Sequence, residues 1–136
     1  MSEPFLIRLP MGDDLLQAIA QEFQKRSIAK AAFTLIGAVS RATLGYYDPV
    51  ARQYGSREFD TQLEIVSCMG NVSEKDGEMF VHAHALLSDK DYLCVGGHIM
   101  PGTIIFAAEL WGNPVSGPIP VRKFDEPTGL ALWSND

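Results

Sequence analysis

Residues 76–87 read DGEMFVHAHALL, a turn signal followed by a run with two distinct faces. Asp-Gly is a strong hairpin signal because both residues tolerate the positive backbone angles of a tight turn. Beyond the turn, the odd positions from Met79 to Leu87 are all apolar and predict a strand face packed on the core. The even positions carry His82 and His84 between Phe80 and Leu86, so we expect this strand to be buried on both sides.

Further extended segments are predicted before and after this hairpin, from apolar runs bounded by Pro, Gly and polar residues. They cover residues 4–9, 31–39, 41–47, 59–70, 92–95, 103–111 and 121–124. The last of them follows a loop rich in Pro and Gly, which is typical of an edge strand.

One helix is predicted between the first two extended segments. Its apolar stripe repeats at helical spacing through Leu15, Leu16, Ile19, Ala20 and Phe23. Either Asp13 or Asp14 can cap its start, and Gln17 follows Asp14 by three residues as in a capping box. One main helix among many strands predicts an α+β fold with a mostly antiparallel or mixed β-sheet. We assign residues 1–136 to this single domain.

The charge balance argues against direct nucleic-acid binding. The chain has 11 Lys and Arg against 17 Asp and Glu, a formal net charge of −6, whereas a nucleic-acid binder usually presents a basic face to phosphates. The N-terminus lacks a basic start followed by an apolar run, and Gly and Pro interrupt the longest uncharged stretch, residues 92–108. We therefore expect a cytoplasmic protein without a membrane partner, in which Cys68 and Cys94 stay reduced.

The three histidines of the chain all fall within residues 82–98. Alternate residues on one strand face are about 6.5–7 Å apart, which lets two imidazoles lean toward one ion. The predicted turn at residues 88–91 returns the chain beside the first strand, so His98 can meet His82 and His84. Three histidines with an open position are typical of catalytic zinc, although iron, manganese, nickel and copper also accept imidazole. The alternative is a set of hydrogen-bonded core histidines without a metal.

Two carboxylates interrupt apolar runs and complete the candidate site. Glu109 lies within residues 104–111, where it could be a catalytic general base, a fourth ligand, or an acceptor for an imidazole N–H. The alternative for Glu109 is an outward-facing position at a sheet edge. Glu64, within residues 63–69, raises the same question. The sequence contains no motif for nucleotide binding or serine hydrolase chemistry.

Several segments together resemble the PPC domain, a domain of plants and prokaryotes. The matching residues are Leu63–Val72, His82–Ala85, Gly96–His98, Gly102 and Ala108-Glu109, within a likeness that runs from residues 5–9 to residues 129–130. The resemblance implies an α/β sandwich-like domain that assembles as a homotrimer. It also implies similarity in fold to acetolactate decarboxylase, whose metal is held by three histidines. Carried over, those positions are His82, His84 and His98.

Plant members join this domain to an AT-hook, and the family is often described as DNA-binding for that reason. This chain has no Arg-Gly-Arg-Pro segment and keeps histidines that the plant domains generally lack, which weakens the DNA-binding interpretation. Our leading hypothesis is a homotrimeric zinc-binding protein that acts on a small-molecule ligand as a metal-dependent lyase or hydrolase. The alternative is a regulatory module that binds another protein, or DNA, without catalysis.

Overall fold

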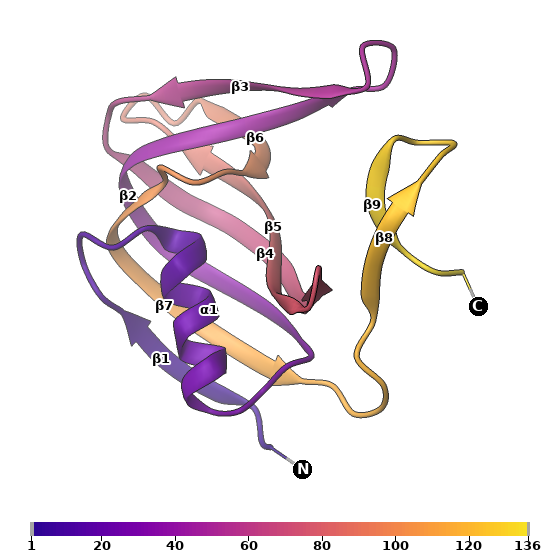
Figure 1. Ribbon diagram of the computed structural model, residues 1–136. Helices are drawn as coiled ribbons and strands as arrows, with labels where there is room; N and C mark the ends of the chain where they lie inside the picture. Colours follow the sequence, from indigo (N-terminus) through magenta and orange to yellow (C-terminus); the bar gives the residue numbers. More distant parts are fainter. Residues whose placement is uncertain (1, 136) are drawn as a thin grey trace.

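Long strands make up most of residues 2–135, the part of the chain that the computed structural model describes (Figure 1). The elements in chain order are β1 (Phe5–Leu9), α1 (Leu15–Lys25), β2 (Ala31–Asp48), β3 (Gln53–Phe59), β4 (Leu63–Lys75), β5 (Glu78–Ser88), β6 (Cys94–Ile99), β7 (Ile104–Pro114), β8 (Val121–Asp125) and β9 (Leu130–Trp133). Among these residues every strand pair is antiparallel except β4 with β8. The predicted α+β fold, with one main helix and a mostly antiparallel, mixed sheet, is confirmed.

The 18-residue strand β2 organises the sheet because its two halves pair with different strands. Its first half pairs with β4 and β7, and its second half pairs with β3 and β6. β4, β5 and β6 are antiparallel neighbours in sequence order, so the pairings form a closed circuit that begins and ends at β2. Opposite Leu35 to Gly37 of β2, β4 carries one extra residue, and at Gly37 φ is 145° and a Cβ would overlap the carbonyl group of Ala107.

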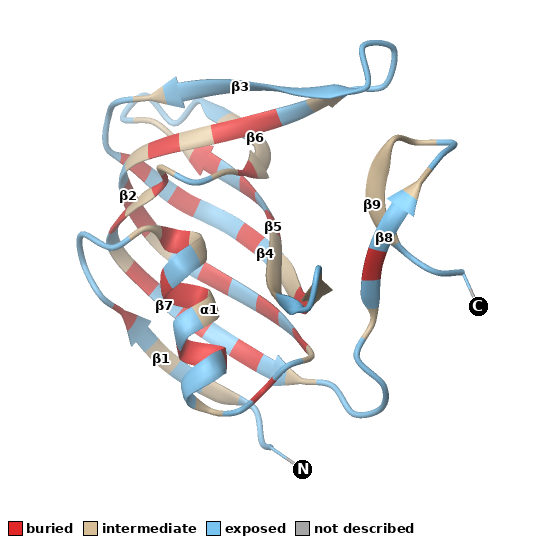
Figure 2. Cartoon of the chain, in the orientation of Figure 1, coloured by how far each residue is buried: buried red, intermediate tan, exposed pale blue. Residues whose placement is uncertain are grey.

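Helix α1 covers one side of the sheet, which we call the inner face (Figures 1 and 2). It begins at the N-cap Asp14, whose carboxylate accepts a hydrogen bond from the Gln17 N–H at 3.2 Å, as the capping pattern predicts. Leu15, Ile19 and Phe23 are buried in the core between helix and sheet. Within residues 2–135, no helix is long and apolar enough to cross a membrane.

The opposite side of the sheet, which we call the outer face, is open. Strand register aligns its side chains across five strands in the order His84, Met69, Thr34, Trp111 and Leu6. The outward residues on these strands include His82, His84 and Leu86 on β5, Asn71 and Met69 on β4, Ala32, Thr34 and Ile36 on β2, Asn113, Trp111 and Glu109 on β7, and Leu6 and Arg8 on β1.

The expectation that β5 is buried on both sides is wrong. Its odd positions Ala83, Ala85 and Leu87 are buried as predicted, but His84 and Leu86 on the outer face are exposed (Figure 2). The reason is that α1 packs on the inner face alone. The apolar residues that frame the histidines therefore belong to an open apolar surface and not to a second core.

The strand boundaries differ from the prediction in four places. The sequence does not predict β3 or β9, and it joins residues 59–70 into one segment where the structure ends β3 and begins β4. β3 is exposed along nearly its whole length, so its polar sequence carries no alternating apolar signal. Gly96, Gly97 and His98 lie inside β6 and not beyond a strand at residues 92–95.

Candidate metal centre

Strand pairing places the three histidines together. His82 and His84 are alternate residues of β5, and His84 lies directly opposite His98 in the register with β6. His98 also lies opposite Gly45 of β2. A Cβ at Gly97 would stand 2.9 Å from the Gly45 carbonyl oxygen, so glycine allows β6 to come this close to β2. The structure thus brings together the three residues that the sequence proposes as ligands.

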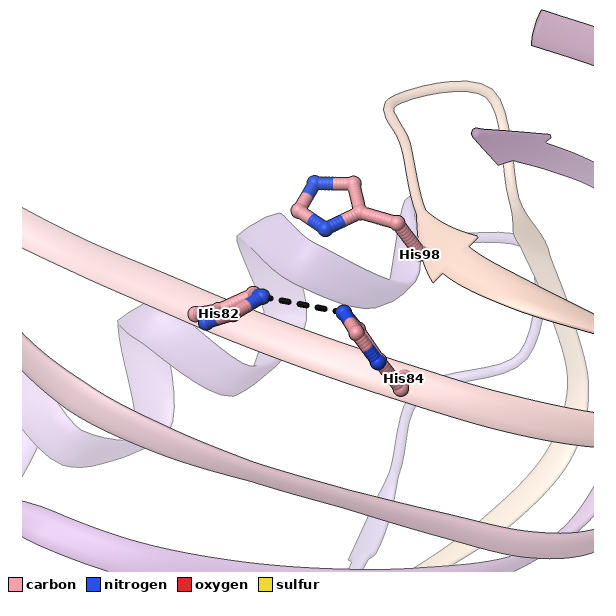
Figure 3. Close-up of side chains that lie close together, drawn as sticks. All are labelled: His82, His84 and His98. Atoms are coloured by element: carbon pink, nitrogen blue, oxygen red, sulfur yellow. Dashed lines mark hydrogen bonds between the residues drawn. The ribbon is translucent and has the colours of Figure 1, made fainter. Parts of the chain in front are cut away.

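The imidazole nitrogens are spaced closely enough for one ion (Figure 3). His82 Nε2 and His84 Nε2 are 3.1 Å apart, and tetrahedral zinc with bonds of roughly 2.0–2.1 Å requires ligand nitrogens about 3.3 Å apart. One nitrogen from each histidine lies within 4.8 Å of the other two. After a small adjustment of the side chains, a single divalent ion could reach all three rings.

Burial and nearby positive charge keep two of these rings neutral. Burial, followed by the charges of Arg122, His98 and His84, lowers the pKa of His82 to about 4. Burial is also the main cause that lowers the pKa of His98. A neutral imidazole offers a lone pair to a metal. The buried Nδ1 atom of His98 has no hydrogen-bond partner among the described residues, which favours a metal site over a set of hydrogen-bonded core histidines.

Three further side chains border the histidines. Arg122 on β8 places its Nη2 atom 3.4 Å from His82 Nδ1 and 3.1 Å from Asn71 Oδ1. The ring of Tyr54 on β3 packs against His98 with the centroids 4.9 Å apart. Sequence reasoning does not single out any of the three. The one available signal for Arg122 is its place in the predicted edge strand, where alternation allows a basic side chain to point inward.

Glu109 and Glu64 are not brought to the histidines of their own chain. Glu109 is exposed on the outer face, in a groove of about 520 Å³ that is lined in part by Leu6, Ile36 and Trp111. Three strand spacings of about 4.8 Å separate β7 from β5, so Glu109 lies roughly 14 Å from His84 along the sheet. Glu64 is exposed on β4. In residues 2–135 the three histidines are the one group of three or more His, Cys, Asp or Glu side chains close enough to share an ion.

A small sheet domain with three converging histidines on an open face belongs to the class of candidate metal-binding domains. The chain belongs to the Plants and Prokaryotes Conserved (PCC) domain family, whose model matches residues 1–111. This match confirms the resemblance to the PPC domain, and it contains the three histidines and Glu109. β8 and Arg122 lie beyond its end.

Solved structures of other proteins share the fold over nearly the whole chain. The metal-containing protein AF0104 of Archaeoglobus fulgidus is 42% identical, with a TM-score of 0.93 over 98% of this chain and 94% of that one. A PPC protein of Pyrococcus horikoshii is 34% identical, with a TM-score of 0.92 over 98% of this chain and 92% of that one. A candidate DNA-binding protein of Ralstonia eutropha JMP134 is 26% identical, with a TM-score of 0.85 over 96% of this chain and 90% of that one.

Among curated proteins, the chain is similar to the bifunctional protein GlmU of Synechococcus sp. (strain JA-2-3B'a(2-13)), with 32% identity over 102 residues. The matched region is 74% of this chain but only 15% of GlmU, so the chain spans a small part of the length of that relative. The activities of the longer protein are therefore not carried over to this chain.

Proposed function

We propose that residues 1–136 form one cytosolic, homotrimeric PPC domain that binds Zn²⁺ through His82, His84 and His98. Its activity is that of a metal-dependent lyase or hydrolase on a small molecule. The observation that carries the proposal is the convergence of three imidazoles, two of which have nitrogens 3.1 Å apart. The 42% identity to a metal-containing protein supports it further.

The surroundings of the histidines suit a ligand that arrives from the outer face. His84 is exposed while His82 and His98 are half-buried, and a depression of about 340 Å³ beside them is lined in part by Met69 and Asn71. A divalent ion held there would act as a Lewis acid toward a carbonyl or phosphoryl oxygen of the ligand. Three protein ligands are the number found in catalytic zinc sites, whereas structural sites usually have four.

The outer face supplies a surface for self-association. Leu6, Ile36, Met69 and Trp111 are between 55% and 81% exposed there, and a contiguous apolar surface of this kind marks a site of protein association. The homotrimer that the family resemblance implies would remove these side chains from water. A second copy of the chain is therefore the partner that we propose for this face.

Glu109 lies within the same apolar surface and can reach a histidine set only on another copy. Glu109 is flanked by Ile36 on β2 and Arg8 on β1 in the strand register. A carboxylate that becomes buried in an interface needs a compensating partner. We therefore assign the proposed catalytic carboxylate to the histidine site of a neighbouring copy, where it would take or give a proton.

Metal analysis of protein purified without a His tag tests the site directly. We expect one zinc ion per chain for the wild type and close to none for His82→Ala, because two imidazoles bind zinc much more weakly than three. Gln21→Ala is a matched control, since Gln21 is exposed on α1, on the opposite side of the sheet from the histidines, and it should retain the metal. Full zinc content in His82→Ala, or a wild type that binds no zinc, would contradict the proposal.

Direct nucleic-acid binding is the second candidate, and one observation favours it. The Ralstonia relative, 26% identical, is a candidate DNA-binding protein. The net charge of −6 opposes this function. Fluorescence anisotropy with a mixed-sequence duplex at low salt decides between metal-dependent activity and nucleic-acid binding. We expect no binding. A measurable affinity that falls steeply with added salt would favour the nucleic-acid function.

A further inference from the structure

Arg122 is a buried cation without an anionic partner. The residue is 9% exposed, and none of the ion pairs among residues 2–135 includes it. Moving a guanidinium out of water is costly unless hydrogen bonds or an opposite charge compensate, and this burial lowers the pKa of Arg122. The group therefore has either a structural role through hydrogen bonds alone or an anion to bind.

Hydrogen bonds use only part of this guanidinium. Nη1 donates to the Ala131 carbonyl oxygen at 3.2 Å, and Nη2 donates to Asn71 Oδ1 at 3.1 Å. The rings of Phe80 and Trp133 pack against the group, with centroids 5.2 and 4.9 Å from Cζ. The buried Nε has no partner among the described residues. A guanidinium has five N–H donors, so these contacts fix its position and leave donors unused.

The remaining contact of Arg122 is with the histidine set. Nη2 lies 3.4 Å from His82 Nδ1, while His82 Nε2 faces His84. A neutral imidazole that gives the Nε2 lone pair to a metal carries its proton on Nδ1. Two donors would then face each other, and Arg122 would lose the acceptor that His82 otherwise offers.

We propose that Arg122 binds the oxyanion group, a carboxylate or a phosphate, of the small molecule that reaches the three-histidine site. Arg122 Nη2 lies 3.4 Å from His82 Nδ1, on the opposite side of the ring from the Nε2 atom that faces His84, so the bound oxyanion would lie beside the His82 ring. Arginine suits this task because its donors are paired in a fixed plane that matches carboxylate and phosphate. The inference rests on the proposed function for its metal and adds the chemical class of the ligand.

Calorimetric titration of the zinc-loaded wild type and of zinc-loaded Arg122→Gln tests this role. Glycolate and glycolamide are matched probes, since they have similar size and differ in charge, and inorganic phosphate is the third probe. We expect the wild type to bind glycolate or phosphate about tenfold or more tightly than glycolamide. Arg122→Gln should lose this preference and keep its zinc, while Arg57→Gln, which removes an exposed arginine of β3, should behave as the wild type.

Two results would overturn the inference while the metal site stands. They are equal binding of charged and neutral probes by the zinc-loaded wild type, and an undiminished preference in Arg122→Gln. A wild type that binds no zinc counts against the proposed function instead.

Arg122→Lys decides the question if Arg122→Gln does not fold. Lysine keeps the positive charge but not the paired donors, so oxyanion affinity should fall by about three- to tenfold. An unchanged affinity would exclude a paired contact by Arg122.

Discussion

The outer face carries polar side chains among apolar ones both at its β5 end and at its β7 end. Only at the β5 end do the polar side chains lie close together. At the β5 end, His84 lies opposite His98 and two residues from His82 along the strand, so three imidazoles converge. At the β7 end, Glu109 stands between Ile36 and Arg8 in the register, and among the described residues no second acid and no histidine lines the groove around it. Alternation along a strand places a side chain on a face, whereas the pairing of strands determines which polar groups meet.

The largest expected effect is at the β7 end. Trp111→Glu should convert the proposed trimer into monomers, because a charge buried in an interface costs several kcal/mol. Sedimentation velocity distinguishes the trimer from the 14.9 kDa chain. Tyr46→Glu changes an aromatic residue that is more exposed than Trp111, 77% against 57%, and that is not one of the outer-face residues named above; this variant should stay trimeric. A monomeric wild type would contradict self-association and favour the regulatory protein-interaction alternative.

At the β5 end, His98→Ala should weaken zinc binding by about a hundredfold or more. This magnitude follows because removing a group that only hydrogen-bonds to a metal ligand already lowers metal affinity by about 10- to 100-fold, and His98 is itself a proposed ligand. Competition with a chromophoric chelator measures the affinity. The trimer should persist in this variant, and Gln21→Ala, which changes an exposed residue of α1, should match the wild type. Zinc affinity within threefold of the wild type would remove His98 from the site.

Glu109→Gln tests whether Glu109 of one copy lies at the three-histidine site of a neighbouring copy. In the trimeric protein we expect zinc affinity to fall by about three- to tenfold, because a carboxylate near the ion is lost. In the Trp111→Glu background the same substitution should have no effect, since a monomer keeps Glu109 far from its own histidines. An equal effect in both backgrounds would show that Glu109 does not act across an interface.

The smallest effect concerns the two cysteines, Cys68 on the buried side of β4 and Cys94 at the start of β6. Burial raises the pKa of the Cys68 thiol to about 12, whereas Cys94 is exposed at the start of β6. Because the thiolate is the reactive form, a thiol reagent at pH 8 should label one cysteine per native chain and two in denaturant. Cys94→Ser should abolish labelling of the native protein. Rapid labelling that persists in Cys94→Ser would show that the inner face opens readily.

Local pattern is enough to predict the helix cap, the hairpin turn and the inner face of β5. The Asp76-Gly77 turn has φ values of 53° and 77°, as the tight hairpin requires. The exposure of the second face of β5 could not be predicted. Phe80 and Leu86 are apolar on that face, and apolar residues occur there both when another layer of the same chain covers the strand and when none does. Pattern alone does not separate a core from an open apolar surface.

The candidate site was predictable where its residues share a hairpin and not where they come from distant strands. His82, His84 and His98 lie on adjacent strands joined by a short turn, so the chain itself implies that they meet. Arg122 reaches His82 only because β8 pairs in parallel with β4, a long-range pairing that no spacing rule indicates. Tyr54 comes from β3, whose exposed polar sequence gives no strand signal.

The position of β7 between β1 and β2 has a consequence for how the chain folds. β1 is synthesised before β2 to β6, yet its only partner strand among residues 2–135 is β7, which is synthesised after them, so β1 and one edge of β2 must wait for β7. Closing such long loops slows folding, and we expect refolding over milliseconds to seconds. Until β7 is added, a nascent chain presents an unpaired edge to other chains, which makes late synthesis the stage most prone to aggregation.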